Sequence, residues 1–134
     1  MFMYLQKNKK GFTLIELMVV VAIIGILALL GLRLYSGQQE KAKEAIVKAN
    51  AGTAQTLVQA ALADKMLTLT EALAEAQKGK MHNPYDNTEA NAVISSGTTA
   101  GAVLISLDED TGVFTFQGLN KSGALFGDIL SAQR

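Results

Sequence analysis

The sequence predicts an α+β protein in which a long N-terminal helix is followed by a short helix and a small group of strands. Three observations lead to this prediction. Residues 12–32 are almost entirely apolar, and residues 38–63 are rich in helix-forming residues with no Pro to interrupt them. Three short strand-like runs follow residue 91.

The first half of the long helix has the length and composition of a membrane-spanning segment. Residues 12–32 are enough to cross the hydrocarbon core, which takes about 20 apolar residues, and Glu16 is the only charged residue among them. Three lysines and no acidic residue precede this segment: Lys7, Lys9 and Lys10. This basic flank favours a cytoplasmic N-terminus. No small-residue cleavage site of the secretory type follows the apolar run, so we expect the helix to continue.

Glu16 needs a physical explanation, because a carboxylate inside hydrocarbon costs on the order of 3 kcal/mol or more. One interpretation places Glu16 near the membrane interface, where water still reaches it. The other pairs it with a group on a partner, since ionisable residues within spanning helices usually face a partner or a cavity.

The run from Lys9 to Glu16, KKGFTLIE, followed at once by the apolar segment, resembles the leader junction of type IV prepilins and pseudopilins. The resemblance covers about residues 1–35. It implies that a prepilin peptidase cleaves after Gly11 and that the new N-terminal residue, Phe12, is N-methylated. It divides the chain into a leader (1–11), a transmembrane and assembly helix (12–35) and a globular head (36–134). It also implies the type IV pilin fold, in which the second half of the long helix packs on a small C-terminal antiparallel sheet.

The same resemblance implies a homopolymeric helical filament as the functional state. The subunit would lie in the cell membrane before assembly and outside the cell afterwards, with an assembly platform and ATPases as partners. Cleavage would give Phe12 a free ammonium group, which could pair with Glu16 of a neighbouring subunit. Each charge is costly alone in a low-dielectric bundle, so we expect this pair to fix the register between subunits.

Two features depart from the pattern of many pilins. No Pro follows the apolar run, so any local loss of helix in a fibre would fall between Gly25 and Gly31. The chain also has no Cys, so a disulfide cannot close the C-terminal loop, and other contacts must hold that segment.

The second half of the long helix is predicted to be buried on more than one face. An apolar stripe recurs at helical spacing: Val47, Ala51, Ala54, Val58, Ala61 and Leu62. A narrow polar stripe lies beside it: Lys41, Glu44, Lys48, Gln55 and Gln59. A third arc is made of small residues: Ala42, Ala45, Ala49, Thr53 and Ala60. We expect the apolar stripe to pack on the head and the small arc on other subunits, the alternative being that alanine here serves only as a helix former.

The remainder of the chain is predicted to alternate between short elements and turns. The long helix should end at Ala63, and Thr68 with Glu71 forms a capping-box pattern before a short helix over 71–78. Strands are expected at 92–95, 102–107 and 113–117, the last two joined by a hairpin at 108–112. In the last strand, Phe114 and Phe116 alternate with polar or smaller residues and should share one face. Residues 125–130 fit either a strand or a short helix.

Composition leaves little room for catalysis. Without Cys and with His82 as the only His, thiol catalysis and multi-histidine metal sites are excluded. The acidic turns near Asp86 and Asp108 could be read as calcium ligands, but solvated turns are the favoured interpretation. Twelve basic residues balance twelve acidic ones, so no obligate nucleic-acid partner is expected. We therefore expect no enzyme activity, cofactor or metal.

Two alternatives to a pilus subunit remain open at this point. The first is a pseudopilin of a type II secretion or competence system, which shares the N-terminal chemistry. The second is a single-span anchored binding domain that never polymerises and keeps its first residues. The sequence does not distinguish motility, adhesion, DNA uptake or electron transfer as the role of the fibre.

Overall fold

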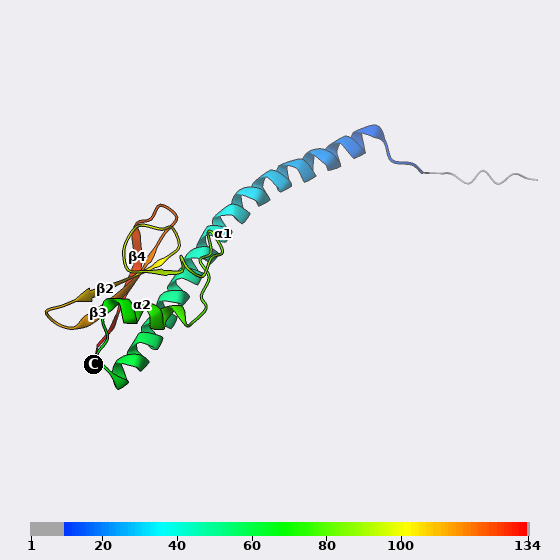
Figure 1. Cartoon of the computed structure of the whole chain (residues 1–134). Coiled ribbons are helices and arrows are strands. Elements are labelled where there is room, and N and C mark those ends of the chain that lie inside the picture. Colours follow the sequence, from blue (N-terminus) through cyan, green and yellow to red (C-terminus); the bar gives the residue numbers. More distant parts are fainter. Residues whose placement is uncertain (1–9, 134) are drawn as a thin grey trace, which may run out of the picture. The chain divides into compact units, whose positions relative to one another are not determined.

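The computed structural model describes residues 10–133 and divides the chain into two units, residues up to Gln38 and residues from Gln39 onward. Helix α1 (Leu14–Asp64) is 51 residues long, includes residues of both units and is continuous through Gly25 and Gly31 (Figure 1). The helix begins two residues after the predicted start at Phe12, because Thr13 caps it and Phe12 precedes the cap. It ends one residue after the predicted end at Ala63.

The first unit has no core of its own among its described residues. Every large apolar side chain from Phe12 to Tyr35 is at least 51% exposed. By length and composition α1 could cross a membrane, and it is the only helix among residues 10–133 that meets this criterion.

In the second unit, α1 buries the predicted apolar stripe. Val47, Ala54 and Val58 are fully buried, and Ala51 and Leu62 are nearly so. The small-residue arc lies on the other side and is exposed in the single chain.

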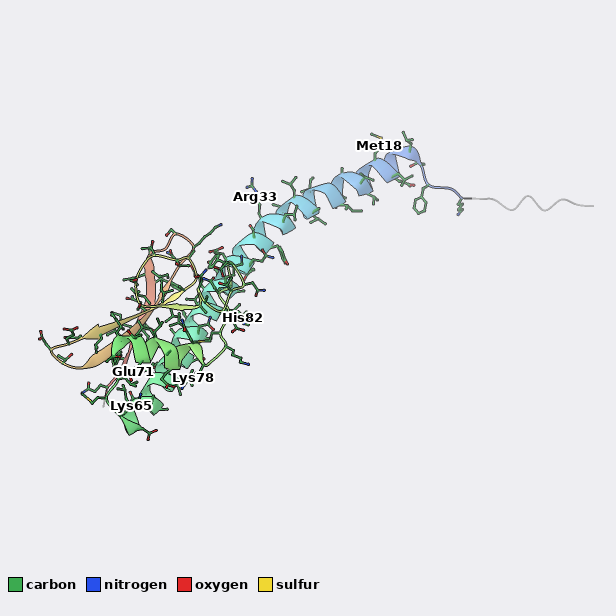
Figure 2. The ribbon with its side chains drawn as sticks, viewed as in Figure 1. Met18, Arg33, Lys65, Glu71, Lys78 and His82 are labelled. Carbon is green, nitrogen blue, oxygen red and sulfur yellow. The ribbon has the colours of Figure 1, made fainter. Side chains whose placement is uncertain are left out.

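Helix α2 (Leu69–Gln77) starts where the capping-box pattern predicted, two residues earlier than the range of 71–78. The Thr68 hydroxyl accepts a hydrogen bond from the Glu71 amide, and the Glu71 carboxylate accepts one from the Thr68 amide. Lys65 donates to the same carboxylate over 3.1 Å (Figure 2). The Thr68 hydroxyl also donates to this carboxylate, over 3.0 Å. The Thr68 backbone amide, then Lys65 and the Thr68 hydroxyl, lower the pKa of Glu71 to about 2.

The loop between α2 and the sheet is organised around Asn83, which is fully buried. Its Nδ2 donates to the carbonyls of Asn91 and Ala100, and its Oδ1 accepts from the Tyr85 amide. Tyr85 in turn donates its hydroxyl to Glu40 on α1. Burial, followed by the Glu40 carboxylate, raises the pKa of Tyr85 to about 12.

Four strands form one sheet in the order β1-β2-β3-β4. They are β1 (Val93–Ile94), β2 (Val103–Asp108), β3 (Val113–Leu119) and β4 (Leu125–Ala132). The pairs β2–β3 and β3–β4 are antiparallel as expected, whereas β1 pairs with β2 in parallel, so the sheet is mixed. The α+β fold with a long helix packed on a small sheet is confirmed, and residues 125–130 belong to a strand.

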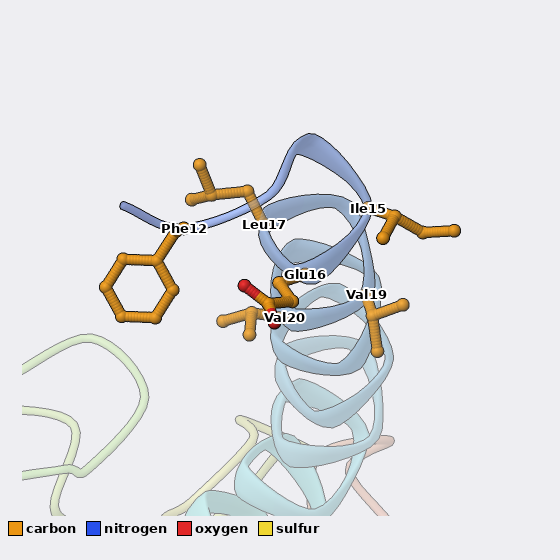
Figure 3. Close-up of a pocket in the computed structure, with 6 residues that line it drawn as sticks. All are labelled: Phe12, Ile15, Glu16, Leu17, Val19 and Val20. Atoms are coloured by element: carbon orange, nitrogen blue, oxygen red, sulfur yellow. The ribbon is translucent and has the colours of Figure 1, made fainter. Parts of the chain in front are cut away.

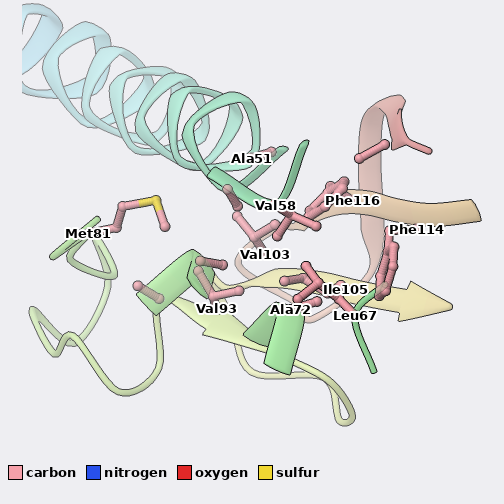
Figure 4. Packing of buried hydrophobic residues seen from close by; sticks show 14 of the residues in the cluster. Ala51, Val58, Leu67, Ala72, Met81, Val93, Val103, Ile105, Phe114 and Phe116 are labelled. Atoms are coloured by element: carbon pink, nitrogen blue, oxygen red, sulfur yellow. The ribbon is translucent and has the colours of Figure 1, made fainter. Parts of the chain in front are cut away.

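The core of the second unit lies between α1, α2 and one face of the sheet (Figure 4). Phe114 and Phe116 point inward from β3, as the alternation predicted, together with Ile105 from β2. Strand β3 comes close to α1 at Gly118, where a Cβ atom would lie 2.7 Å from Val47 Cγ1. Glycine at this position therefore permits the close approach of strand and helix.

Strand β4 is held by glutamine side chains of α1. Gln55 Nε2 donates to the Ser131 carbonyl over 2.7 Å. Gln59 Nε2 donates to the Gln133 carbonyl over 2.7 Å, and Gln59 Oε1 accepts a hydrogen bond from the Gln133 backbone amide over 3.1 Å. These contacts hold the C-terminal segment in a chain that has no Cys to form a disulfide.

Candidate assembly site

The N-terminus of α1 is built as a second capping box. Thr13 N donates to Glu16 Oε2 over 2.9 Å, and Glu16 N donates to Thr13 Oγ1 over 3.3 Å. The Thr13 carbonyl also accepts the first helical hydrogen bond, from Leu17 N. Thr13 is therefore the N-cap and Glu16 the third helical residue, the positions that a capping box requires.

This geometry gives Glu16 a local partner in the isolated subunit. A carboxylate in the first turn is also favoured by the positive end of the helix dipole. One backbone donor leaves much of the acceptor capacity of a carboxylate free, since its two oxygens offer about four lone-pair sites. Glu16 can therefore keep its bond to Thr13 and still accept a hydrogen bond from a cation.

The surroundings of Glu16 are apolar. A surface hollow of about 640 Å³ is lined by Glu16 and five apolar side chains: Phe12, Ile15, Leu17, Val19 and Val20. In Figure 3, Phe12 and Val20 lie on the same side of the helix as the Glu16 carboxylate, and Ile15 and Val19 lie on the other side. No further charged residue occurs on α1 until Arg33. An ammonium group brought to this hollow would face a single carboxylate.

The predicted processing residues precede this cap. Gly11 and Phe12 are exposed and lie outside the helix. A Cβ atom added at Gly11 would meet no heavy atom within 4 Å. The rest of the predicted leader, residues 1–9, lies outside the described residues.

The sequence reasoning missed the role of Thr13, although the signal was present. Thr13 and Glu16 have the same spacing as Thr68 and Glu71, which did predict a cap. The resemblance implies an ammonium group of a neighbouring subunit as the partner of Glu16, and the structure adds a local hydrogen bond from Thr13.

The acidic turns use their carboxylates internally. Asp86 accepts hydrogen bonds from Thr88 and Asn91, and Asp108 accepts them from the Asp110 and Thr111 amides. Hydrogen bonding lowers the pKa of both carboxyl groups: the Asn91 side chain contributes most for Asp86, and the Thr111 side chain contributes most for Asp108, ahead of the two amides. Within residues 10–133 no three His, Cys, Asp or Glu side chains gather as metal ligands would.

Comparison with known proteins shows which family this chain resembles. The family model described as "Prokaryotic N-terminal methylation motif" matches residues 6–32. Fimbrial protein EcpC of Eikenella corrodens is 32% identical over 109 residues, which cover 81% of this chain and 69% of that protein. The chain belongs to the type IV pilin family.

Two other relatives match a shorter part of the chain. Fimbrial protein EcpB of Eikenella corrodens is 51% identical over 56 residues, 42% of this chain and 35% of that protein. The type IV major alpha-pilin of Moraxella bovis is 48% identical over 54 residues, 40% of this chain and 34% of that protein. The matched part thus spans about a third of the length of these two relatives. No solved structure gives a significant match to this pilin.

Proposed function

We propose that this pilin is the structural subunit of a type IV pilus filament and polymerises through residues 12–35 after cleavage following Gly11. The observation that carries the proposal is the apolar surface of this segment, where every large apolar side chain is at least half exposed. Full burial of a Val, Leu or Ile side chain is worth about 1.5–3 kcal/mol. Because residues 12–35 expose many such side chains, this segment requires a bilayer, or other copies of the same helix, around it.

Glu16 supplies the specificity that apolar packing lacks. Cleavage places the ammonium group of Phe12 next to the capping box, and N-methylation of an amine retains its charge. In a bundle, the Phe12 ammonium of one subunit pairs with Glu16 of another, while Thr13 keeps its bond to the carboxylate. Apolar surfaces can slide past one another at little cost, whereas an unpaired charge in the bundle is strongly unfavourable. The pair therefore selects one axial offset between neighbours.

The precursor is held in the membrane with its lysine-bearing leader on the cytoplasmic side, where a prepilin peptidase removes it. An assembly platform and ATPases then extract the subunit into the fibre. Residues 36–134 form the head that covers the helical bundle. Motility, adhesion or DNA uptake is the role we propose for such a fibre, and each of these is mechanical rather than catalytic.

The replacement Glu16→Ala tests the assembly role. We expect cleavage after Gly11 to persist, because the site of cleavage is unchanged, and the yield of sheared surface fibres to fall at least tenfold. Fibre yield is measured by immunoblot and processing by the N-terminal mass. Glu89→Ala is the matched control, since it removes an exposed carboxylate from the head. Normal fibre yield from Glu16→Ala would contradict the proposal.

A further inference from the structure

The two hairpins of the antiparallel part of the sheet lie at its opposite ends. Asp108 pairs with Val113 beside the β2–β3 turn, and Leu119 pairs with Leu125 beside the β3–β4 turn. Because β3 belongs to both hairpins, the turns are separated by its seven residues, roughly 20 Å at about 3.4 Å per residue.

A groove of about 510 Å³ lies beside the β2–β3 turn. Its floor is apolar and includes Leu62, Leu107 and Phe114, and Met66 stands at its edge with 70% of its surface exposed. Glu109 lines the groove from the exposed turn. Within residues 10–133 the Glu109 carboxylate takes part in no ion pair or side-chain hydrogen bond. The groove is therefore an apolar depression with an available negative charge at its rim.

The opposite hairpin has the complementary character. Lys121 is exposed at its turn, and Leu125 is an apolar side chain that is 52% exposed. The Asn120 side chain holds the turn in shape by accepting hydrogen bonds from the Ser122 and Ala124 amides. Lys121 forms no ion pair within the part of the chain that the structure describes. A turn that is already rigid loses little conformational entropy when it docks.

We propose that the groove beside the β2–β3 turn receives the β3–β4 hairpin of a second copy of this pilin, with Leu125 in the groove and Lys121 beside Glu109. The contact joins two different surfaces of the same chain. Such a heterologous contact repeats into an open filament when its rotation does not close a ring. The inference rests on the proposed filament and adds a specific contact between heads to the packing of the N-terminal helices.

Cysteine cross-linking tests this contact cleanly, because the natural chain has no Cys. The double variant T111C/A124C carries one thiol at the groove and one on the docking hairpin, both at exposed positions. Fibres of the full chain are oxidised with copper phenanthroline and run on a non-reducing gel. We expect a ladder of dimers, trimers and longer species. Each single-cysteine variant should stay monomeric, because a head-to-tail contact does not bring two copies of one residue together.

Charge reversal provides a second measurement. E109K and K121E should each lower fibre yield at least threefold, and the double variant should recover to within twofold of the natural chain. Fibres that assemble normally while T111C/A124C stays monomeric would overturn the contact and leave the filament in place. Absence of fibres from the natural chain, seen before any substitution, would overturn the proposed function and this contact with it.

Discussion

Two glutamates of this pilin complete N-terminal helix caps in different surroundings. Glu16 and Glu71 each occupy the third position of a helix and accept a hydrogen bond from the backbone amide of a capping threonine. Glu71 has Lys65 beside it, whereas Glu16 is followed by an apolar segment. Under the function proposed above, the cap at Glu16 also serves as the assembly contact, a role that has no counterpart at Glu71.

The low pKa of Glu71 predicts a specific response to acid. Its folded value of about 2 lies below the ordinary value of 4.5, so the ionised form stabilises the fold. That stabilisation is fully present above pH 4.5 and is lost as the pH falls toward 2. Thermal unfolding of Glu71→Gln followed by circular dichroism should therefore show a weaker pH dependence across this window. Glu89→Gln is the control, and an unchanged pH profile for Glu71→Gln would refute the assignment.

Asn83 is predicted to be the most sensitive polar residue of the head. Asn83→Ala removes three hydrogen bonds and leaves their buried backbone partners without a hydrogen bond. This loss should lower the free energy of unfolding by about 2–3 kcal/mol. Chemical denaturation measures this loss. His82→Ala, at the exposed neighbour, should change stability by less than about 0.5 kcal/mol. A similar small effect at both positions would contradict the role given to Asn83.

At the scale of elements, the sequence predicted those features that follow from local periodicity. The buried stripe of α1 and the inward phenylalanines of β3 repeat at the period of their element, and the cap of α2 follows from the spacing of Thr68 and Glu71. The parallel pairing of β1 could not be predicted, because it depends on where a loop returns the chain. Strand β4 was ambiguous because its pairing with β3 is irregular between Phe116 and Gly118.

The polar stripe of α1 shows the same limit. Lys41, Lys48 and Gln59 are exposed, as expected for a stripe that faces solvent. The amide of Gln59 nevertheless bonds to a residue 74 positions later, a contact that no local pattern reveals. Within the candidate site, the free-energy cost of a carboxylate in an apolar segment points to Glu16. The sequence analysis did not identify Thr13 as its local hydrogen-bond partner.

The glutamine contacts predict how β4 responds to a single substitution. Gln59→Glu places an oxygen where Nε2 now faces the Gln133 carbonyl, so a donor is replaced by a repelling acceptor. We expect a loss of about 1 kcal/mol, which corresponds to roughly fivefold faster amide exchange at the end of β4. Hydrogen exchange with mass spectrometry of the peptide 125–133 measures this. Gln77→Glu, at the end of α2, is the control, and equal exchange in both variants would show that Gln59 does not hold the strand.

At the scale of the whole molecule, the pilin combines a unit that has a core with one whose apolar side chains are exposed. The head buries phenylalanines and aliphatic residues between α1, α2 and the sheet. The first unit leaves its apolar side chains exposed and presents one capped carboxylate among them. This division fits the proposed function, in which the head folds around its own core and the N-terminal helix passes from the bilayer to a bundle of identical helices.

We propose that leader removal after Gly11 converts this chain from a membrane protein into a fibre subunit. The most direct test is the intact mass of the subunit recovered from purified, sheared fibres of cells that express the natural chain. We predict a polypeptide that begins at Phe12 and carries one additional methyl group on its N-terminus. Fibres whose subunit still begins at Met1, or a processed chain that is never recovered in fibres, would contradict the account.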